Sequence, residues 1–462
     1  MKPFGWLDVL RVGLIQACLG AVVVLTTSTL NRVMVVELAL PALLPGVLVA
    51  LHYVVQVARP RMGHGSDVGG RRTPWIIGGM AVLGVGGIVA ALATVWMESS
   101  RLGGMSLAVA GYALVGLGVS ASGTSLLVML AKRVPEGRRA GAATLVWMMM
   151  IAGFAITAGL AGHWLEPYSP ARLLMVSGTV SLLALLVTLA AIHGLEGETS
   201  AKTLPGPAPA PASQDPLRFR QALAQVWDEP VARRFTIIVF ISMLAYSAQD
   251  LILEPFAGTV FGFSPGASTQ LSGVQHGGVL AGMILVALAG AAGARWHMHP
   301  LWRHVGSLRG WTVGGCMASA LALYGLTLAG LDNPDWPLTT NVFLLGVANG
   351  AFSIGAIGSM MRLANEGRES REGIRMGLWG AAQAMAFGLG GLIGTGASDL
   401  ARALVADTGT AYAIVFGLEG SLFVLSATLA WRLGRPTRAN AQAGSTRRSG
   451  LNANTELKGH LT

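Results

Sequence analysis

Two acidic residues stand inside an apolar stretch where a charge is costly. Asp250 and Glu254 lie late in the run from Phe235 to Phe256, beside Gln249 and Pro255. A carboxylate near the middle of a membrane-spanning helix costs about 2.5–3.5 kcal/mol, so such residues mark functional sites by default. The i, i+4 spacing places both on one helical face. They could relay protons or form a fixed polar contact; the alternative is a water-facing position at the lipid headgroups.

The helix that carries these acids is expected to end at Pro255, because proline interrupts a helix. Both acids would then lie near the outer end of their span. Arg32 and Glu37 flank the outer end of the first apolar run. Arg32 is therefore the expected counter-charge of Asp250 or Glu254, because charged groups within membranes pair with one another.

Composition indicates an integral membrane protein. Of the 462 residues, 53% are hydrophobic and 12% charged, too apolar a chain for one soluble core. The net charge of +10 does not indicate nucleic-acid binding, because the basic residues lie in loops between apolar runs. Cys18 and Cys316 fall inside predicted spans, which excludes a disulfide framework and a cysteine metal site. No removable signal peptide is expected.

Twelve apolar runs predict an all-α membrane protein of twelve transmembrane helices in two six-helix pseudo-repeats. The predicted domains are 1–193, the first half; 194–233, a cytoplasmic linker with an interfacial helix; 234–433, the second half; and 434–462, a disordered basic tail. The predicted spans are 12–31, 39–58, 74–97, 105–131, 142–163, 172–192, 235–256, 270–294, 310–331, 338–361, 374–397 and 409–432.

The basic residues predict the orientation. If both termini are cytoplasmic, then of the 32 Lys and Arg residues only Arg32, Arg101, Arg172 and Arg402 lie on the other face. Cytoplasmic loops carry such an excess of Lys and Arg. An odd number of spans would destroy this asymmetry, so an even number is favoured.

Short motifs recur in the two halves. Glu136-Gly137-Arg138 followed by Trp147 returns as Glu366-Gly367-Arg368 followed by Trp379. Parallel six-helix repeats are the architecture of the major facilitator superfamily, whose site lies at the repeat interface. The loop after the second span resembles the superfamily signature G-x-x-x-D-x-x-G-R-R, in which the aspartate latches the cytoplasmic side. The matching residues are Gly63, Asp67, Gly70, Arg71 and Arg72; Val68 departs from the common pattern, and a loop that only sets orientation is the alternative.

Three stretches resemble the PucC family, a branch of this superfamily found in phototrophic bacteria. They are Thr29–Leu38, Gln249–Gly262 and Gly377–Ala384. The resemblance implies a role in assembling light-harvesting complexes in the inner or intracytoplasmic photosynthetic membrane, through binding or delivery of bacteriochlorophyll or a precursor. The implied partners are membrane lipid, bacteriochlorophyll, antenna polypeptides or pigment-synthesis enzymes.

A pigment requires an apolar cleft with a few polar groups. Histidine is the usual protein ligand of a chlorin magnesium, so His52 and His276 are candidates, although each is more commonly a hydrogen-bonded residue of the bundle. No other metal site is expected. The full set of cavity candidates is Asn31, Arg32, Glu37, His52, Gln249, Asp250, Glu254, His276, Trp379 and Gln383, with helix packing as the alternative for Trp379.

Two classes of function remain open on the sequence. One is an assembly factor that binds pigment or antenna subunits; the other is a proton-coupled transporter of a small solute with Asp250 or Glu254 as proton carrier. No enzyme motif is present: the chain has neither a P-loop nor an H-E-x-x-H zinc motif. A non-enzymatic role is therefore expected.

Overall fold

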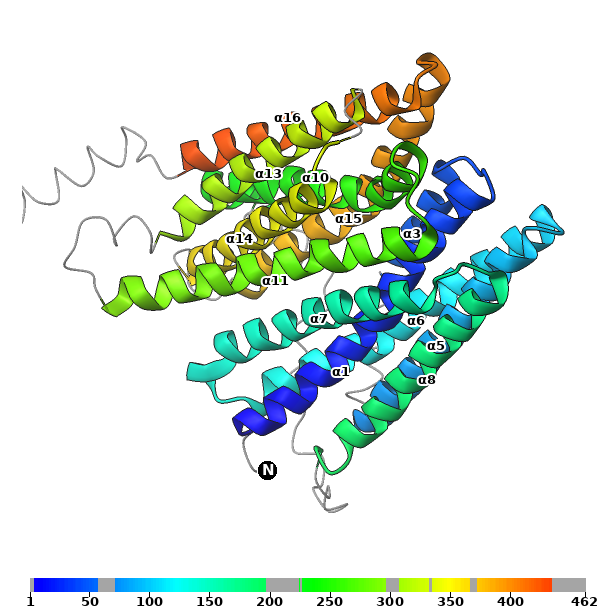
Figure 1. Cartoon of the computed structure of the whole chain (residues 1–462). Helices are drawn as coiled ribbons and strands as arrows, with labels where there is room; N and C mark the ends of the chain where they lie inside the picture. The colour runs from blue at the N-terminus through cyan, green and yellow to red at the C-terminus, as the bar shows by residue number, and fades with distance from the viewer. Residues whose placement is uncertain are drawn as a thin grey trace, which may run out of the picture.

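The computed structural model describes residues 4–56, 71–196, 224, 227–295, 307–331, 335–365 and 372–433, and these residues form helices and short turns. Helices are the expected solution, because a spanning segment must satisfy its own backbone hydrogen bonds where no water is available. Long helices lie side by side through the molecule (Figure 1). Parts of the predicted linker, the predicted interfacial helix, Gly63 to Gly70 and the tail lie outside the described residues.

The first helix is continuous from Trp6 to Glu37 and has four parts: α1 (Trp6–Val24), η1 (Leu25–Thr29), α2 (Leu30–Arg32) and η2 (Val33–Glu37). With these four taken as one, the described residues form twelve helices. The others are α3 (Leu43–Val55), α5 (Thr73–Trp96), α6 (Arg101–Arg133), α7 (Glu136–Trp164), α8 (Pro170–Ile192), α10 (Pro230–Val260), α11 (Pro265–Arg295), α13 (Leu308–Gly330), α14 (Leu338–Asn365), α15 (Glu372–Leu404) and α16 (Thr408–Leu433).

Ten helices of the described part are long and apolar enough to cross a membrane. The chain is therefore a multi-pass membrane protein. The second predicted span, 39–58, is shorter in the structure, where α3 begins only at Leu43. The expectation that Pro255 ends its helix is wrong, because α10 continues to Val260 with Pro255 inside it.

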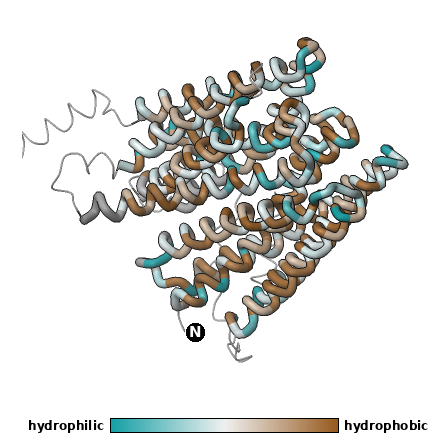
Figure 2. The backbone as a smooth tube through the Cα atoms, in the orientation of Figure 1, coloured by the Kyte–Doolittle hydropathy of each residue, from teal (hydrophilic) through white to brown (hydrophobic). Residues whose placement is uncertain are grey.

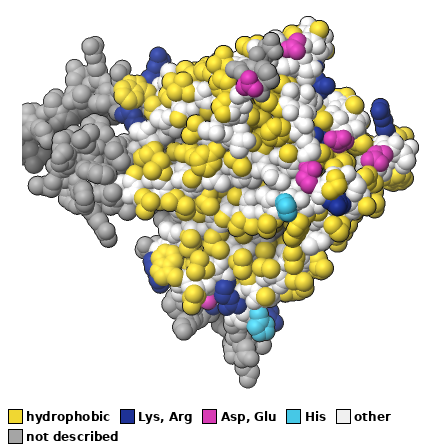
Figure 3. All heavy atoms as spheres, in the orientation of Figure 1, with side chains coloured by type: hydrophobic (Ala, Val, Ile, Leu, Met, Phe, Trp, Pro, Cys, Tyr) yellow, Lys and Arg dark blue, Asp and Glu magenta, His cyan; other side chains and the backbone are white. Residues whose placement is uncertain are grey.

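The hydropathy of the residues changes along each helix, from its middle to its ends. Apolar residues dominate along the helices, while polar residues gather toward their ends (Figure 2). On the face shown in Figure 3, hydrophobic side chains cover the middle and charged side chains lie mainly toward two ends. A surface of this kind is suited to a hydrocarbon layer bounded by water on both sides.

The connections between helices define two ends of the bundle. We call the end that carries residues 38–42, 97–100, 165–169, 261–264, 331, 335–337 and 405–407 the far end. The near end carries residue 4, the α6–α7 turn at residues 134–135, and the segment that follows α8.

The helices pack in two groups. In the first, α5 packs on α6 and α8, α1 packs on α7 and α8, and α3 packs on α6. In the second, α13 packs on α14 and α16, α10 packs on α15 and α16, and α11 packs on α14. The groups meet where α7 contacts α11, where α3 contacts α15, and where η1, α2 and η2 contact α10.

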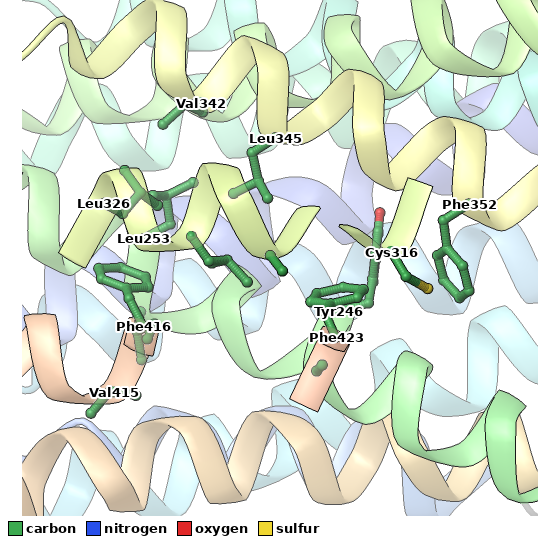
Figure 4. Packing of buried hydrophobic residues seen from close by; sticks show 14 of the residues in the cluster. Tyr246, Leu253, Cys316, Leu326, Val342, Leu345, Phe352, Val415, Phe416 and Phe423 are labelled. Carbon is green, nitrogen blue, oxygen red and sulfur yellow. The ribbon is translucent and has the colours of Figure 1, made fainter. Parts of the chain in front are cut away.

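Aromatic and aliphatic side chains fill the core of the second group. Tyr246 and Leu253 of α10, Cys316 of α13, Phe352 of α14 and Phe423 of α16 belong to one cluster (Figure 4). Glycines bring α15 close to α10, because a Cβ atom at Gly390 or Gly394 would lie 2.6 Å from a carbonyl oxygen of α10. Small residues at this spacing allow two helices of a membrane protein to approach closely.

Candidate functional site

The first helix brings its polar residues to the second group through two π-helical turns. These turns, Leu25–Thr29 and Val33–Glu37, lie on either side of α2. A π-turn widens a helix and is frequent at functional sites. Here it accompanies burial of Asn31 and Arg32, whose side chains are 0% and 2% exposed. The amide of Asn31 donates to the Leu251 carbonyl at 2.7 Å, and its oxygen is buried without a partner.

Arg32 is a buried cation that joins both groups of helices. Its guanidinium forms an ion pair with Glu37 and donates to the Phe263 carbonyl at 2.6 Å. Gly258 leaves room for it, because a Cβ atom there would lie 2.9 Å from the guanidinium. The expected pairing with Asp250 or Glu254 is only partly right: Glu37 is the direct partner, and Arg32 acts on Glu254 through space.

Glu254 lies deep in the bundle, 2% exposed, and not at the end of its helix. Its carboxylate accepts a hydrogen bond from the hydroxyl of Ser28, and Ser28 lies 3.0 Å from the hydroxyl of Ser272. The second carboxylate oxygen of Glu254 is buried and has no hydrogen-bond partner among the described residues. The three residues come from η1, α10 and α11, so this contact joins the two groups.

Asp250 and Gln249 continue the polar region along α10. Asp250 is half-buried and accepts a hydrogen bond from the Gln275 amide at 3.1 Å. The Gln249 side chain is fully buried, and in the part of the chain that the structure describes neither its nitrogen nor its oxygen has a partner with regular hydrogen-bond geometry. Buried amides are normally satisfied, so Gln249 is available to a ligand.

The two candidate histidines differ in what their ring nitrogens contact. Nδ1 of His276 lies 2.9 Å from the Ser272 carbonyl, and the ring packs edge-on against Phe154 at 5.0 Å between centroids. A carbonyl only accepts, so Nδ1 carries the proton and Nε2 keeps a lone pair. His52 is 2% exposed and its Nε2 lies 2.8 Å from the Gln56 amide nitrogen, so that nitrogen is engaged.

Trp379 and Gln383 lie on α15, away from these contacts. Trp379 is 1% exposed, packs edge-on against Phe235 at 5.0 Å, and directs its indole N–H toward the Ala232 carbonyl at 3.5 Å. It is a packing residue in these contacts, which is the alternative that the sequence allowed. Gln383 is half-buried.

A buried acid on α16 escaped the sequence analysis. Glu419 is 3% exposed, and among the described residues neither of its carboxylate oxygens has a hydrogen-bond partner. Glu419 could have been found from the sequence, because it lies in the middle of an apolar run. The rule that selected Asp250, an acidic residue inside a membrane span, applies equally to it. Ser28, Ser272 and Gln275 were also missed, because hydroxyls and amides are common in membrane helices.

The buried carboxylate of Glu419 should lower the stability of the folded protein and be kept because function requires it. Replacing it by leucine is expected to raise the free energy of unfolding by about 1–3 kcal/mol, because an unsatisfied buried polar group is removed, and to impair activity in the cell. Denaturation of the purified protein in detergent measures the first effect. A leucine variant that is less stable than the parent would show that the carboxylate has partners worth keeping.

The predicted latch is described only at its last two residues. Arg71 is exposed and Arg72 half-buried, and the backbone N–H groups of Arg72 and Thr73 donate to the Glu196 carboxylate at 2.6 and 2.9 Å. The Thr73 hydroxyl donates to it at 2.6 Å. Burial alone would raise the pKa of Glu196, but these hydrogen bonds and the Arg72 charge outweigh it and hold the pKa below its ordinary value of 4.5. Glu196 therefore caps the start of α5 as an anion.

Removing this cap should destabilise the protein in a pH-dependent way. Glu196→Ala is expected to lower the free energy of unfolding by about 0.5–2 kcal/mol. The lowered pKa means that the contribution is fully present above pH 4.5 and is lost as pH falls through the folded-state pKa. Thermal unfolding in detergent on both sides of pH 4.5 tests this, with Glu98→Ala at an exposed acid as control. An equal loss at both pH values would contradict the cap.

A separate cavity of about 710 Å³ opens at the far end. It lies among the ends of α10 and α13 and the start of α16, and its lining includes Thr259, Gly330 and Asp407. None of the polar residues described above lines it. This cavity and the buried polar residues therefore lie in different places, and the unsatisfied polar groups identify the candidate site.

Fold and site together define a class of protein: a multi-pass helical membrane protein with the fold of the major facilitator transporters. The structure is similar to the D-xylose-proton symporter (TM-score 0.66, 14% identity, 93% of this chain and 97% of that one). It is also similar to a bacterial homologue of the human lysosomal transporter Spinster in an inward-facing, unoccupied conformation (TM-score 0.64, 14% identity, 94% and 97%).

The sequence narrows this class to one family. The chain belongs to the PUCC protein family, whose profile matches residues 29–437. It is 52% identical to the bacteriochlorophyll synthase 44.5 kDa chain of Rhodobacter capsulatus over 426 residues, which cover 92% of this chain and 95% of that protein. It is 28% identical to protein PucC of Rhodobacter capsulatus over 434 residues, 91% and 89% of the two chains. The resemblance seen in the sequence is confirmed.

Proposed function

We propose that this protein is an assembly factor for light-harvesting complexes that binds or delivers bacteriochlorophyll or a precursor in the photosynthetic membrane. The observation that carries the proposal is the set of buried polar groups without partners, on Asn31, Gln249, Glu254 and Glu419, in a chain whose relatives are named for bacteriochlorophyll synthesis and PucC. Groups of this kind are costly unless a ligand satisfies them. The photosynthetic role rests on these relatives, and pigment binding rests on the site.

A bacteriochlorin fits the chemistry of these residues. Its magnesium takes a nitrogen ligand, and Nε2 of His276 has the required lone pair because Nδ1 is held by the Ser272 carbonyl, as in other metal-binding histidines. The Gln249 amide can donate to a ring carbonyl, and Phe154 offers an apolar surface beside His276. We assign the ligand role to His276 and not to His52, whose Nε2 contacts Gln56. Arg32 and Glu37 fix the helices that carry these groups.

We further propose that the chain is built as two six-helix repeats, 1–193 and 234–433, joined by the linker 194–233 and followed by the tail 434–462. Support comes from packing, because the main contacts within the first group have counterparts in the second: α5 with α6 corresponds to α13 with α14, and α1 with α7 to α10 with α15. We also propose that both termini face the cytoplasm. A reporter fused to the N-terminus that responds as periplasmic would disprove this orientation.

The role in assembly is tested by complementation. In a strain that lacks the protein, the parent chain should restore antenna absorption, and Asp250→Ala should restore less than the parent, because it removes the charged partner of Gln275. Membrane abundance of the variant, measured by immunoblot, separates loss of function from loss of protein. Full antenna absorption in the absence of the protein would overturn the proposal.

A proton-coupled transporter is the second candidate. It is favoured by the half-buried Asp250, by the buried Glu254 and by the fold shared with a proton symporter. This alternative predicts that Asp250→Asn keeps the fold and abolishes proton-coupled uptake of a solute in reconstituted vesicles while antenna levels stay normal. We propose no enzymatic step, although one relative is named as a chain of a synthase; a supporting role beside such an enzyme is consistent with that name.

A further inference from the structure

A carboxylate on α15 caps a helix of the other group. At the far end of the bundle, Asp399 accepts hydrogen bonds from the backbone N–H groups of Ala42 at 2.9 Å and Leu43 at 2.7 Å. These N–H groups begin α3, where a helix has unpaired donors and a partial positive charge. Below this contact the two helices touch closely, because a Cβ atom at Gly46 would lie 2.2 Å from the Thr395 hydroxyl. Asp399 therefore links the two groups directly.

A second carboxylate forms the corresponding contact on the other side of the bundle. Glu166, just after α7, accepts a hydrogen bond from the Ser264 hydroxyl. Ser264 in turn accepts from the Ala267 N–H at 3.1 Å and so caps the start of α11. Gly162 and Gly266 permit the approach, since a Cβ atom at Gly266 would lie 2.4 Å from the Gly162 carbonyl and from the Glu166 carboxylate.

The two contacts are equivalent by position in the chain. Glu166 lies just after α7, the fifth helix of the first group, and Asp399 lies near the end of α15, the fifth helix of the second group. Their partners lie at the starts of α11 and α3, each the second helix of its group. Each group thus contributes one acid and one helix start to the far end. Contacts of this kind hold while the helices stay together and are lost when they separate, which suits a contact with two states.

We propose that Asp399 and Glu166 form a paired clasp that keeps the far end closed, so that the polar residues between the groups are screened from that side. One buried contact between the two groups is that of Thr29 with Thr269, whose hydroxyls lie 3.1 Å apart. Thr269 is fully buried. Its accessibility therefore reports whether the far end is open.

The test uses a chain in which Cys18 and Cys316 are replaced by alanine and Thr269→Cys is the reporter. The protein is held in lipid nanodiscs and treated with a polar maleimide. Asp399→Ala together with Glu166→Ala should raise the initial labelling rate by about 5- to 150-fold, the range typical of coupling between conformational states. Asp407→Ala is the matched control, because Asp407 caps its own helix at the Thr410 N–H (2.6 Å) and joins nothing to the other group.

Three outcomes overturn the clasp: an unchanged labelling rate, an equal rise in the Asp407→Ala control, or an equal rise at a reporter near the other end. Thr236→Cys serves as that last reporter, because Thr236 is buried near the start of α10. If the double alanine variant does not fold, Asp399→Asn with Glu166→Gln keeps the volume and removes the charges, and the same rise at Thr269→Cys is expected. The labelling rates do not depend on bound pigment. A negative result for the clasp therefore leaves the proposed function untouched, and a failure to bind pigment leaves the clasp untouched.

Discussion

Arg32→Met should lower the free energy of unfolding by about 1.5–3 kcal/mol, the usual contribution of a hydrogen bond made by a charged group; the Glu37 carboxylate that is left behind is exposed to water. The substitution keeps the volume of the side chain and removes the cation that pairs with Glu37, bonds the Phe263 carbonyl and acts on Glu254. Because these partners lie on different helices, the loss should also reduce the amount of protein in the membrane. Denaturation in detergent and quantitative immunoblotting measure the two effects.

Arg402→Met is the control for this experiment, since Arg402 also lies toward the far end but is exposed. Exposed charges contribute about 0–1 kcal/mol, so the control should resemble the parent. Equal stability of the Arg32 and Arg402 variants would contradict the assignment of Arg32 as the cation that holds the first helix to the second group.

His276→Leu should remove the preference of the protein for a magnesium bacteriochlorin over the same macrocycle without its metal. The parent is expected to bind the magnesium form at least about tenfold more tightly, equivalent to about 1.4 kcal/mol, because only that form takes a bond from Nε2. The leucine variant keeps an apolar surface beside Phe154, so residual binding of both forms should be similar. Fluorescence quenching titrations in detergent give the four dissociation constants.

His52→Leu provides the matched comparison in the same titrations. Its Nε2 contacts Gln56, so this substitution should leave the preference for magnesium intact. A preference lost in the His52 variant and kept in the His276 variant would reverse the assignment of the ligand.

The sequence predicted the class of fold well, because apolar runs of spanning length and basic loops depend on local composition. It failed where backbone geometry depends on packing. Pro255 is tolerated inside α10 because neighbouring helices and side chains can compensate a proline in a membrane helix. The π-helical turns around Arg32 have no pattern in the sequence, and without them the direction of its side chain could not be foreseen.

The sequence predicted which residues belong to the candidate site better than it predicted their hydrogen-bond and ion-pair partners. Arg32, Glu254 and Asn31 were named correctly as buried polar groups, since each interrupts an apolar run. The partner of Arg32 could not be chosen, because Glu37 lies five residues along the same helix and the acids of α10 lie across the bundle. Glu419 was missed although it satisfies the same rule, since it is a buried acid inside an apolar run.

The central claim is that this protein carries a bacteriochlorin in the membrane, and the absorption spectrum of the purified parent chain tests it most directly. The protein should be purified from pigmented membranes in mild detergent, separated from antenna complexes, and extracted to quantify pigment per chain. We predict bound bacteriochlorophyll or a precursor in near-stoichiometric amount, strongly reduced in the His276→Leu variant. A folded parent protein without pigment, from membranes rich in it, would contradict the claim.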